Sequence, residues 1–155
     1  MKYDFPIIFT PLEGGGYMVQ GYDVKGCLTE GETMEEAEFM ADDALNLLLL
    51  TLEEKHRKDL IPTPTPIEEV KLNEGEIVKM IHADTEAYAK RTAKIEANPI
   101  KAAREAAKLT IKQLAELLEA PYRTVQNWDN GSRKAPKWLQ KLVVEKIESS
   151  VAKEI

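Results

Sequence analysis

The chain has 155 residues, 43% of them hydrophobic, and a formal net charge of −6 at pH 7. This length and hydrophobic content allow one medium-sized domain or two small ones with buried cores. The longest apolar run, Leu45 to Leu52, falls far short of the roughly 20 residues of a membrane-spanning helix, and the single cysteine excludes an internal disulfide. Because the N-terminus also shows no signal-peptide pattern, we expect a cytoplasmic protein.

Acidic and basic residues are segregated along the chain. Residues 1 to 98 hold 10 Lys and Arg against 20 Asp and Glu, whereas residues 99 to 155 hold 11 against 7. This asymmetry favours two domains, an acidic one followed by a basic one. The basic part can contact phosphates although the whole chain is acidic, because salt screens charges more than about 10 Å apart.

Alternating apolar residues near the N-terminus predict a β-hairpin. One face of a strand over residues 2 to 9 would hold Tyr3, Phe5, Ile7 and Phe9. A second strand is predicted over residues 16 to 22, after a glycine-rich turn. A third short strand is predicted over Lys25 to Thr29.

A long helix is predicted to follow these strands. Thr33 and Glu36 form a capping box, in which each side chain accepts a hydrogen bond from the backbone N–H of the other residue. Apolar residues then recur at helical spacing as far as about Arg57; they are Ala37, Met40, Ala41, Ala44, Leu45, Leu48 and Leu52.

The rest of the acidic half predicts a crossover, a strand and a helix. The stretch IPTPTPIEEV, residues 61 to 70, favours a stiff extended path without a helix because proline lacks the backbone N–H. A strand over 76 to 83 and a helix over 84 to 97 follow. The order β-β-β-α-β is typical of an α+β fold with a helix on one face of a sheet.

After Asn98 every predicted element is a helix. Asn98 suits an N-cap and Pro99 the first helical position. A second capping box at Thr110 and Gln113, with a hydrophobic staple between Leu109 and Leu114, starts a helix over 110 to 118. A turn at 119 to 120 leads to a helix over 121 to 130, and a last helix covers 137 to about 152. These lengths suit a helix-turn-helix.

The helix over 121 to 130 has an apolar and a polar side. At 100° per residue, Pro121, Val125 and Trp128 share the side that should pack. Opposite or flanking them lie residues of the types that contact base edges: Tyr122, Arg123, Thr124, Gln126, Asn127 and Asn130. Asn130, Arg133 and Lys134 are placed to hold phosphates. The alternative is an ordinary polar face of a surface helix.

The stretch LTIKQLAELL followed by TVQNWDNGSRKAP resembles the Cro/repressor class of helix-turn-helix domains. The resemblance covers about residues 98 to 148, and we predict a DNA-binding domain over 98 to 155. It implies base contacts by Tyr122, Arg123, Gln126 and Asn127, and phosphate contacts by Gln113, Asn130 and Arg133. Glu119 stands where the family usually has a glycine of positive φ, which predicts a strained or differently built turn.

The acidic half resembles the HicB family of antitoxins. The resemblance rests on the strand GYMV at residues 16 to 19, the turn GCLTEG at 26 to 31 and the helix start TMEEA at 33 to 37. It spans residues 1 to 92 and departs from the family at 23 to 25, where prolines are usual. It implies a partial ribonuclease-H-like sheet without catalytic residues, which binds and inhibits a small basic HicA-like toxin that cleaves mRNA.

Residues that could serve an enzyme are few, and we expect no catalytic site, metal or cofactor. Cys27 should be a small core residue, and His82 should pack on a strand face with Val78 and Met80. The prediction is therefore an autoregulating HicB-like antitoxin that represses its own operon. Two alternatives stay open: a transcription regulator with a ligand-sensing first domain, and a nuclease that uses the aspartates of the sheet.

The last helix is longer than one small domain needs. Its apolar residues recur at helical spacing; they are Leu139, Leu142, Val143, Ile147 and Val151. The outer part of this helix predicts either pairing with a second copy in a homodimer or higher oligomer, or a frayed, solvated tail.

Overall fold

The computed structural model describes residues 1–153, so the last two residues of the predicted 98 to 155 domain lie outside the described part of the chain. The chain divides into two compact units, Met1–Ala89 (the N-terminal unit) and Lys90–Ile155 (the C-terminal unit). By sequence, the N-terminal unit holds 7 Lys and Arg against 19 Asp and Glu, a formal charge of −12. The C-terminal unit holds 14 against 8, a charge of +6.

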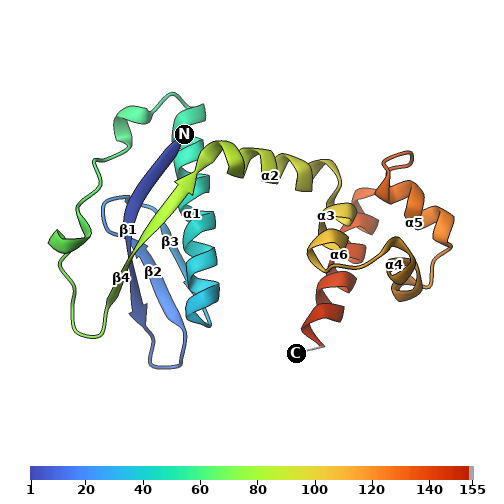
Figure 1. Ribbon diagram of the computed structural model, residues 1–155, viewed down its shortest axis with the longest axis horizontal. Helices are drawn as coiled ribbons and strands as arrows, with labels where there is room; N and C mark the ends of the chain where they lie inside the picture. The colour runs from blue at the N-terminus through green and yellow to red at the C-terminus, as the bar shows by residue number, and fades with distance from the viewer. Residues whose placement is uncertain (154–155) are drawn as a thin grey trace. The chain divides into compact units, whose positions relative to one another are not determined.

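The N-terminal unit contains a four-stranded antiparallel sheet (Figure 1). Its strands are β1 (Lys2–Pro11), β2 (Tyr17–Gly21), β3 (Leu28–Gly31) and β4 (Ile77–Asp84), in the spatial order β3-β2-β1-β4. Phe9 pairs with Val19 on one side of β1, and Phe5 pairs with Ile81 on the other. The predicted α+β class and the hairpin are confirmed.

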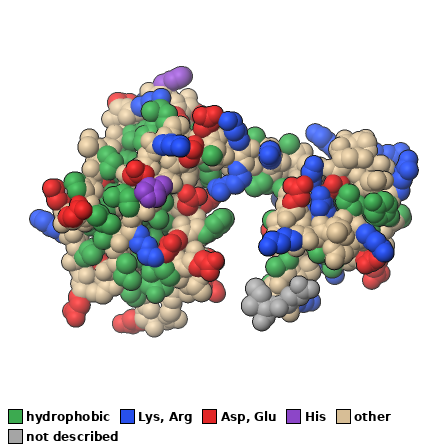
Figure 2. Space-filling model, viewed as in Figure 1, with side chains coloured by type: hydrophobic (Ala, Val, Ile, Leu, Met, Phe, Trp, Pro, Cys, Tyr) green, Lys and Arg blue, Asp and Glu red, His purple; other side chains and the backbone are tan. Residues whose placement is uncertain are grey.

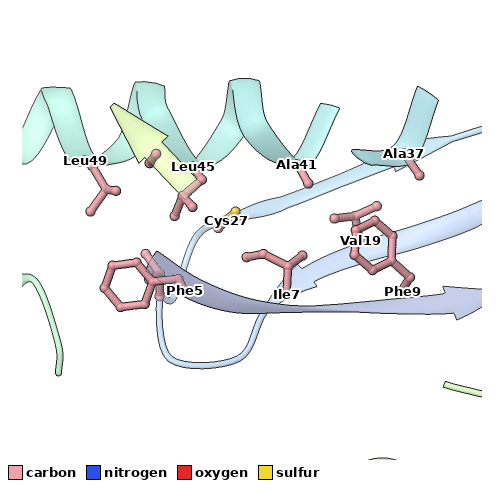
Figure 3. Close-up of a cluster of buried hydrophobic side chains, with 11 residues drawn as sticks. Phe5, Ile7, Phe9, Val19, Cys27, Ala37, Ala41, Leu45 and Leu49 are labelled. Atoms are coloured by element: carbon pink, nitrogen blue, oxygen red, sulfur yellow. The ribbon is translucent and has the colours of Figure 1, made fainter. Parts of the chain in front are cut away.

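The helix α1 (Met34–Glu54) covers one face of this sheet (Figure 1). Every fourth residue of α1 points at the sheet, where the alternate residues of β1 meet it (Figure 3); the fully buried side chains are Phe5, Ile7, Phe9, Val19, Ala37, Ala41, Leu45 and Leu49. Every second side chain of the strand and every fourth side chain of the helix therefore pack in one apolar layer. Each large side chain fully buried here contributes about 1.5 to 3 kcal/mol to folding.

The third strand begins later than predicted, at Leu28 instead of Lys25. The Cys27 N–H donates to the Val24 carbonyl at 3.2 Å, and Gly26 between them has φ 96°. Glycine adopts this left-handed conformation without steric cost, and it makes a tight turn here. Because the turn occupies residues 24 to 27, the strand begins only at Leu28.

Both ends of α1 differ from the prediction. At its start Thr33 accepts the Glu36 N–H at 3.1 Å as expected, but the Glu36 carboxylate accepts the N–H of Glu32 at 2.8 Å instead of that of Thr33. The helix ends at Glu54 and not near Arg57, because His56 takes φ 54° and the Arg57 N–H turns back to the Leu52 carbonyl at 2.8 Å. This is the bonding of a Schellman-type end.

The crossover from α1 to β4 contains two short 3₁₀ turns, Lys58–Leu60 and Ile67–Glu69. The second falls in the proline-rich stretch that was predicted to hold no helix, so the prediction is correct for α-helix and missed this turn. The Asp23 carboxylate fastens the crossover, because it accepts the N–H of Thr65 at 2.8 Å and its hydroxyl at 2.7 Å.

Helix α2 (Thr85–Ala97) leads from β4 into the C-terminal unit. There α3 (Pro99–Ala106), α4 (Ile111–Leu118), α5 (Tyr122–Asp129) and α6 (Lys137–Ala152) surround a second core. Its most buried residues are Ile100, Leu114, Val125, Val143 and Ile147. Within residues 1–153 no helix is both long and apolar enough to span a membrane.

Candidate nucleic-acid interface and acidic surface

Helices α4 and α5 are joined by the three residues 119 to 121. The capping box at the start of α4 is present in full: Thr110 accepts the Gln113 N–H at 3.1 Å, and Gln113 accepts the Thr110 N–H at 2.8 Å. At its end Glu119 has φ 51° and ψ 35°. Families with this motif usually have a glycine with positive φ at this position. Here a glutamate adopts the positive φ, at a cost in folding free energy of about 1 kcal/mol.

Two polar side chains hold the C-terminal end of α5 against α3. Arg104 Nε donates to Asp129 Oδ1 at 2.6 Å and its Nη2 donates to Oδ2 at 3.2 Å, while Nη1 donates to the Leu109 carbonyl at 2.8 Å. Asn98 Nδ2 donates to the carbonyls of Trp128 at 3.0 Å and Asp129 at 3.2 Å. Asp129 is only 8% exposed, so this bidentate pair lies within the unit.

Sequence reasoning missed this Arg104–Asp129 clamp. Asp129 lies within the stretch that resembles the Cro/repressor class, but neither Asp129 nor Arg104 was singled out from the sequence. The available signal was an aspartate one residue after Trp128, on the apolar side of an amphipathic helix. A carboxylate that is buried at this position needs a cationic partner, because burying an unpaired charge is costly in free energy.

The exposed side of α5 carries Tyr122, which is 49% exposed, and Arg123. Gln126 and Asn127 are half-buried, as is Thr124. The prediction for Pro121 is wrong: it is exposed and does not pack beside Val125. The reason is that Pro121 is the N-cap residue, with φ −58° and ψ 132°, so its side chain does not follow the helical angle.

The loop after α5 is fastened by its own hydrogen bonds. Asn130 Oδ1 accepts the N–H of Ser132 at 2.9 Å and its hydroxyl at 2.6 Å, and Gly131 between them has φ 77°. The Arg133 N–H donates to the Asn127 carbonyl at 3.1 Å. These bonds leave the side chains of Arg133 and Lys134 exposed on an ordered loop.

In the view of Figure 2 carboxylates are scattered over the face of the N-terminal unit, among hydrophobic side chains and a few Lys and Arg. A groove of about 450 Å³ lies where the β1–β2 turn meets the start of α1; it is lined by Leu12, Gly15, Glu30, Gly31, Glu32, Glu36 and Met40. On the C-terminal unit the same view shows mainly Lys and Arg among the charged side chains.

A small polar cluster lies at the other end of α1. Glu53 accepts the hydroxyl of Tyr3 at 2.7 Å and the hydroxyl of the fully buried Thr85 at 2.9 Å. Burial and then the hydrogen bond to Glu53 raise the pKa of Tyr3 to about 12. The cluster ties β1, α1 and α2 together.

Two residues considered for chemistry have different surroundings. Cys27 is 1% exposed, as predicted for a core residue, and burial raises the pKa of its thiol. The prediction for His82 is wrong, since its side chain is 76% exposed and Nδ1 hydrogen-bonds the Asp4 carboxylate. The register of the sheet places Asp4 on β1 directly opposite His82 on β4. No group of three or more metal-ligating side chains gathers among residues 1–153.

Comparison with known proteins gives the family of this chain. Residues 5–98 match the HicB-like antitoxin family of bacterial toxin–antitoxin systems. The chain belongs to this family, which confirms the resemblance found in its motifs.

The curated relatives share part of the chain. Over 65 residues it is 43% identical to Antitoxin HicB of Escherichia coli strain K12, covering 41% of this chain and 44% of that protein. Over 63 residues it is 41% identical to Antitoxin HicB 1 of Photorhabdus laumondii, covering 41% of this chain and 39% of that protein. The match thus spans less than half the length of these relatives.

One solved structure has a similar fold. A chain of the toxin–antitoxin complex from Streptococcus pneumoniae superposes with a TM-score of 0.51 and 20% identity, over 57% of this chain and 73% of that one. At this identity the likeness concerns the fold alone.

Proposed function

We propose that this chain neutralises a small basic HicA-like ribonuclease with its N-terminal unit and represses its own operon with its C-terminal unit. The observation that carries the proposal is the division of one HicB-family chain into a compact unit of charge −12 and a compact unit of charge +6. Each unit then has a partner of opposite charge. Such complementarity speeds encounter and disfavours wrong partners. Because mRNA and the operon are the targets, the proposed location is the cytoplasm.

The toxin-binding domain is proposed to span residues 1 to 92, with a partial ribonuclease-H-like sheet. Its support is the family match and the acidic surface. The inhibition is steric, since a bound acidic domain covers the basic surface that a ribonuclease needs for RNA.

The DNA-binding domain is proposed to span residues 98 to 155, with α4 and α5 as a helix-turn-helix. Arg123 and Tyr122, exposed on α5, would reach base edges, and the half-buried Thr124, Gln126 and Asn127 would contact bases at closer approach. Outside α5 the proposed phosphate contacts are Gln113, Asn130, Arg133 and Lys134. The oxygen of Gln113 is occupied by the capping box, so its NH₂ group would make the contact.

A homodimer is proposed to pair two such domains. Its support is the pair of exposed apolar side chains one turn apart on α6, where Trp138 is 64% and Leu142 is 54% exposed. A dimer would bind half-sites whose centres lie about 34 Å apart, or a multiple of that distance. Footprinting on the DNA upstream of the chain's own reading frame should show two symmetric half-sites, and a single half-site bound by a monomer would contradict the dimer.

The experiment that tests the function uses the full chain and the small basic protein encoded beside it. We expect the chain to restore growth of cells that express this neighbour, to protect mRNA from it, and to bind the upstream DNA. DNA binding without rescue would favour the ligand-sensing regulator. Metal-dependent cleavage of nucleic acid by the purified chain would favour the nuclease.

A further inference from the structure

A row of exposed side chains runs along α6, away from the side that packs into the second core. Its members recur at alternating spacings of three and four residues; they are Trp138, Lys141, Glu145, Glu148 and Ala152. We call this row the α6 seam. Val143 and Ile147 lie on the other side of the helix, within the core. Alternating spacings of three and four are those at which two α-helices pack along each other.

The side chains of the α6 seam change in charge and size along the helix. Trp138 and Lys141 lie in its N-terminal half, and Glu148 and Ala152 lie in its C-terminal half. A second α6 packed in the same direction would place lysine beside lysine and the two indole rings beside each other. A second α6 packed in the opposite direction, about an axis at Glu145, places Lys141 beside Glu148 of the second copy. It also places Trp138 over Ala152 of the second copy, so the antiparallel arrangement is favoured by charge and by size.

A groove between α3 and α6, beside the C-terminal end of the seam, has room for an indole ring. Its volume is about 400 Å³, and its lining is mostly apolar; it consists of Ala103, Ala106, Ala107, Ile147, Glu148, Val151 and Ala152. Pockets that hold small organic molecules begin at about 300 Å³. The four alanines leave space above the backbone of both helices. Glu148 can accept the indole N–H, which usually has a hydrogen-bond partner when tryptophan is buried.

The charge of the α6 seam indicates which partner it fits. One lysine against two glutamates gives the seam a formal charge of −1, although the C-terminal unit as a whole carries +6. The seam therefore does not attract the phosphates of nucleic acid. Charges of both signs in one row are complementary to the same row running in the opposite direction. A two-fold dimer would contain each contact twice, because each copy supplies one tryptophan ring and one groove.

We infer that two copies of this chain pair through antiparallel α6 helices, with Trp138 of each copy inserted into the α3–α6 groove of the other. This inference rests on the proposed function, since it assigns a contact surface to the homodimer proposed there. The buried aromatic supplies most of the affinity, and the charges of the seam set the direction of the helices.

Three variants test the two sides of this contact. Trp138→Ala removes the ring and should leave the fold intact, because the side chain is 64% exposed in a single copy. Ala106→Phe fills the groove with a ring from the same chain, at a position that is exposed on α3. Leu28→Ala is the matched control, since Leu28 is 62% exposed but lies on β3 of the N-terminal unit. Circular dichroism checks the fold of each variant.

Sedimentation equilibrium of the full-length chain measures the dissociation constant of the dimer. Trp138→Ala and Ala106→Phe should each raise it at least about 100-fold, because each removes two symmetric contacts of about 10-fold each, and Leu28→Ala should change it less than about 2-fold. An equimolar mixture of Trp138→Ala and Ala106→Phe chains can form a mixed dimer with one intact contact. That mixed dimer should bind about 10-fold more tightly than either variant binds itself. Glu145→Gln should tighten the dimer, because it removes two like charges at the axis.

The outcomes separate the inference from the proposed function. A folded Trp138→Ala chain that dimerises as tightly as the parent would overturn the α6 contact and leave the homodimer in place. A mixture of the two variants that associates no better than each alone would overturn the insertion of the ring into the groove. A parent that is monomeric both free and on its upstream DNA would overturn the inference and the homodimer together. Loss of DNA binding in Trp138→Ala with an unchanged dimer would assign the ring to DNA and would also refute the inference.

Discussion

Replacing Arg104 with alanine should destabilise the C-terminal unit more than any surface substitution. The change removes two hydrogen bonds to Asp129, at 2.6 and 3.2 Å, and one to the Leu109 carbonyl at 2.8 Å. It also leaves a carboxylate that is 8% exposed without its cation. Removal of one partner from such a pair costs about 3 to 5 kcal/mol. That is comparable with the whole stability, about 5 kcal/mol, of a domain this small.

Urea denaturation followed by tryptophan fluorescence measures this effect in the full chain. Both tryptophans, Trp128 and Trp138, belong to the C-terminal unit, so their signal reports its unfolding alone. The matched variant is the double substitution Arg104→Met with Asp129→Leu, which removes both charges and keeps the volume. It should be far more stable than Arg104→Ala, because no charge is left buried without a partner.

A cost of less than about 1 kcal/mol for Arg104→Ala, the value of an exposed ion pair, would refute the role of the clamp. So would a double variant whose loss of stability equals the sum of the losses in the two single variants. In either case the hydrogen bonds of Asn98 to the end of α5, and not the clamp, would hold that helix in place.

Four further predictions concern single residues. Arg123→Ala should leave the thermal transition unchanged and cost about 1 to 3 kcal/mol in discrimination between upstream and unrelated DNA, measured by titration at fixed salt; equal selectivity would refute its base contact. Trp128→Ala, which removes a half-buried aromatic of the second core, should cost about 3 kcal/mol in urea and abolish specific and non-specific DNA binding alike. Glu119→Gly should raise stability by about 1 kcal/mol because φ there is 51°, and a destabilised variant would show that the turn carries no strain. Since the pKa of Tyr3 is raised to about 12, its contribution to stability is full below pH 10 and should be lost as the pH rises from 10 to 12, whereas Tyr3→Phe should show a smaller loss over that window.

The sequence by itself determined the elements whose signals are local. Alternation in β1 predicted that Phe5, Ile7 and Phe9 share a buried face, and helical spacing predicted the inward side of α1, because these periods are properties of the backbone. The capping box of Thr110 with Gln113 was also predicted, since its donors and acceptors lie within one turn. The family followed from short motifs of the same local kind.

Only the tertiary structure decided features that depend on residues distant in the chain. The pairing of β4 with β1 and the clamp between Arg104 and Asp129 join segments whose separation no local period encodes. The exposure of His82 and Phe39 was decided in the same way, because burial depends on which element packs against a face. Pro121 shows the limit within a single helix: one residue outside the helical φ and ψ values turns a predicted core side chain toward solvent, because the helical angle applies only after the N-cap.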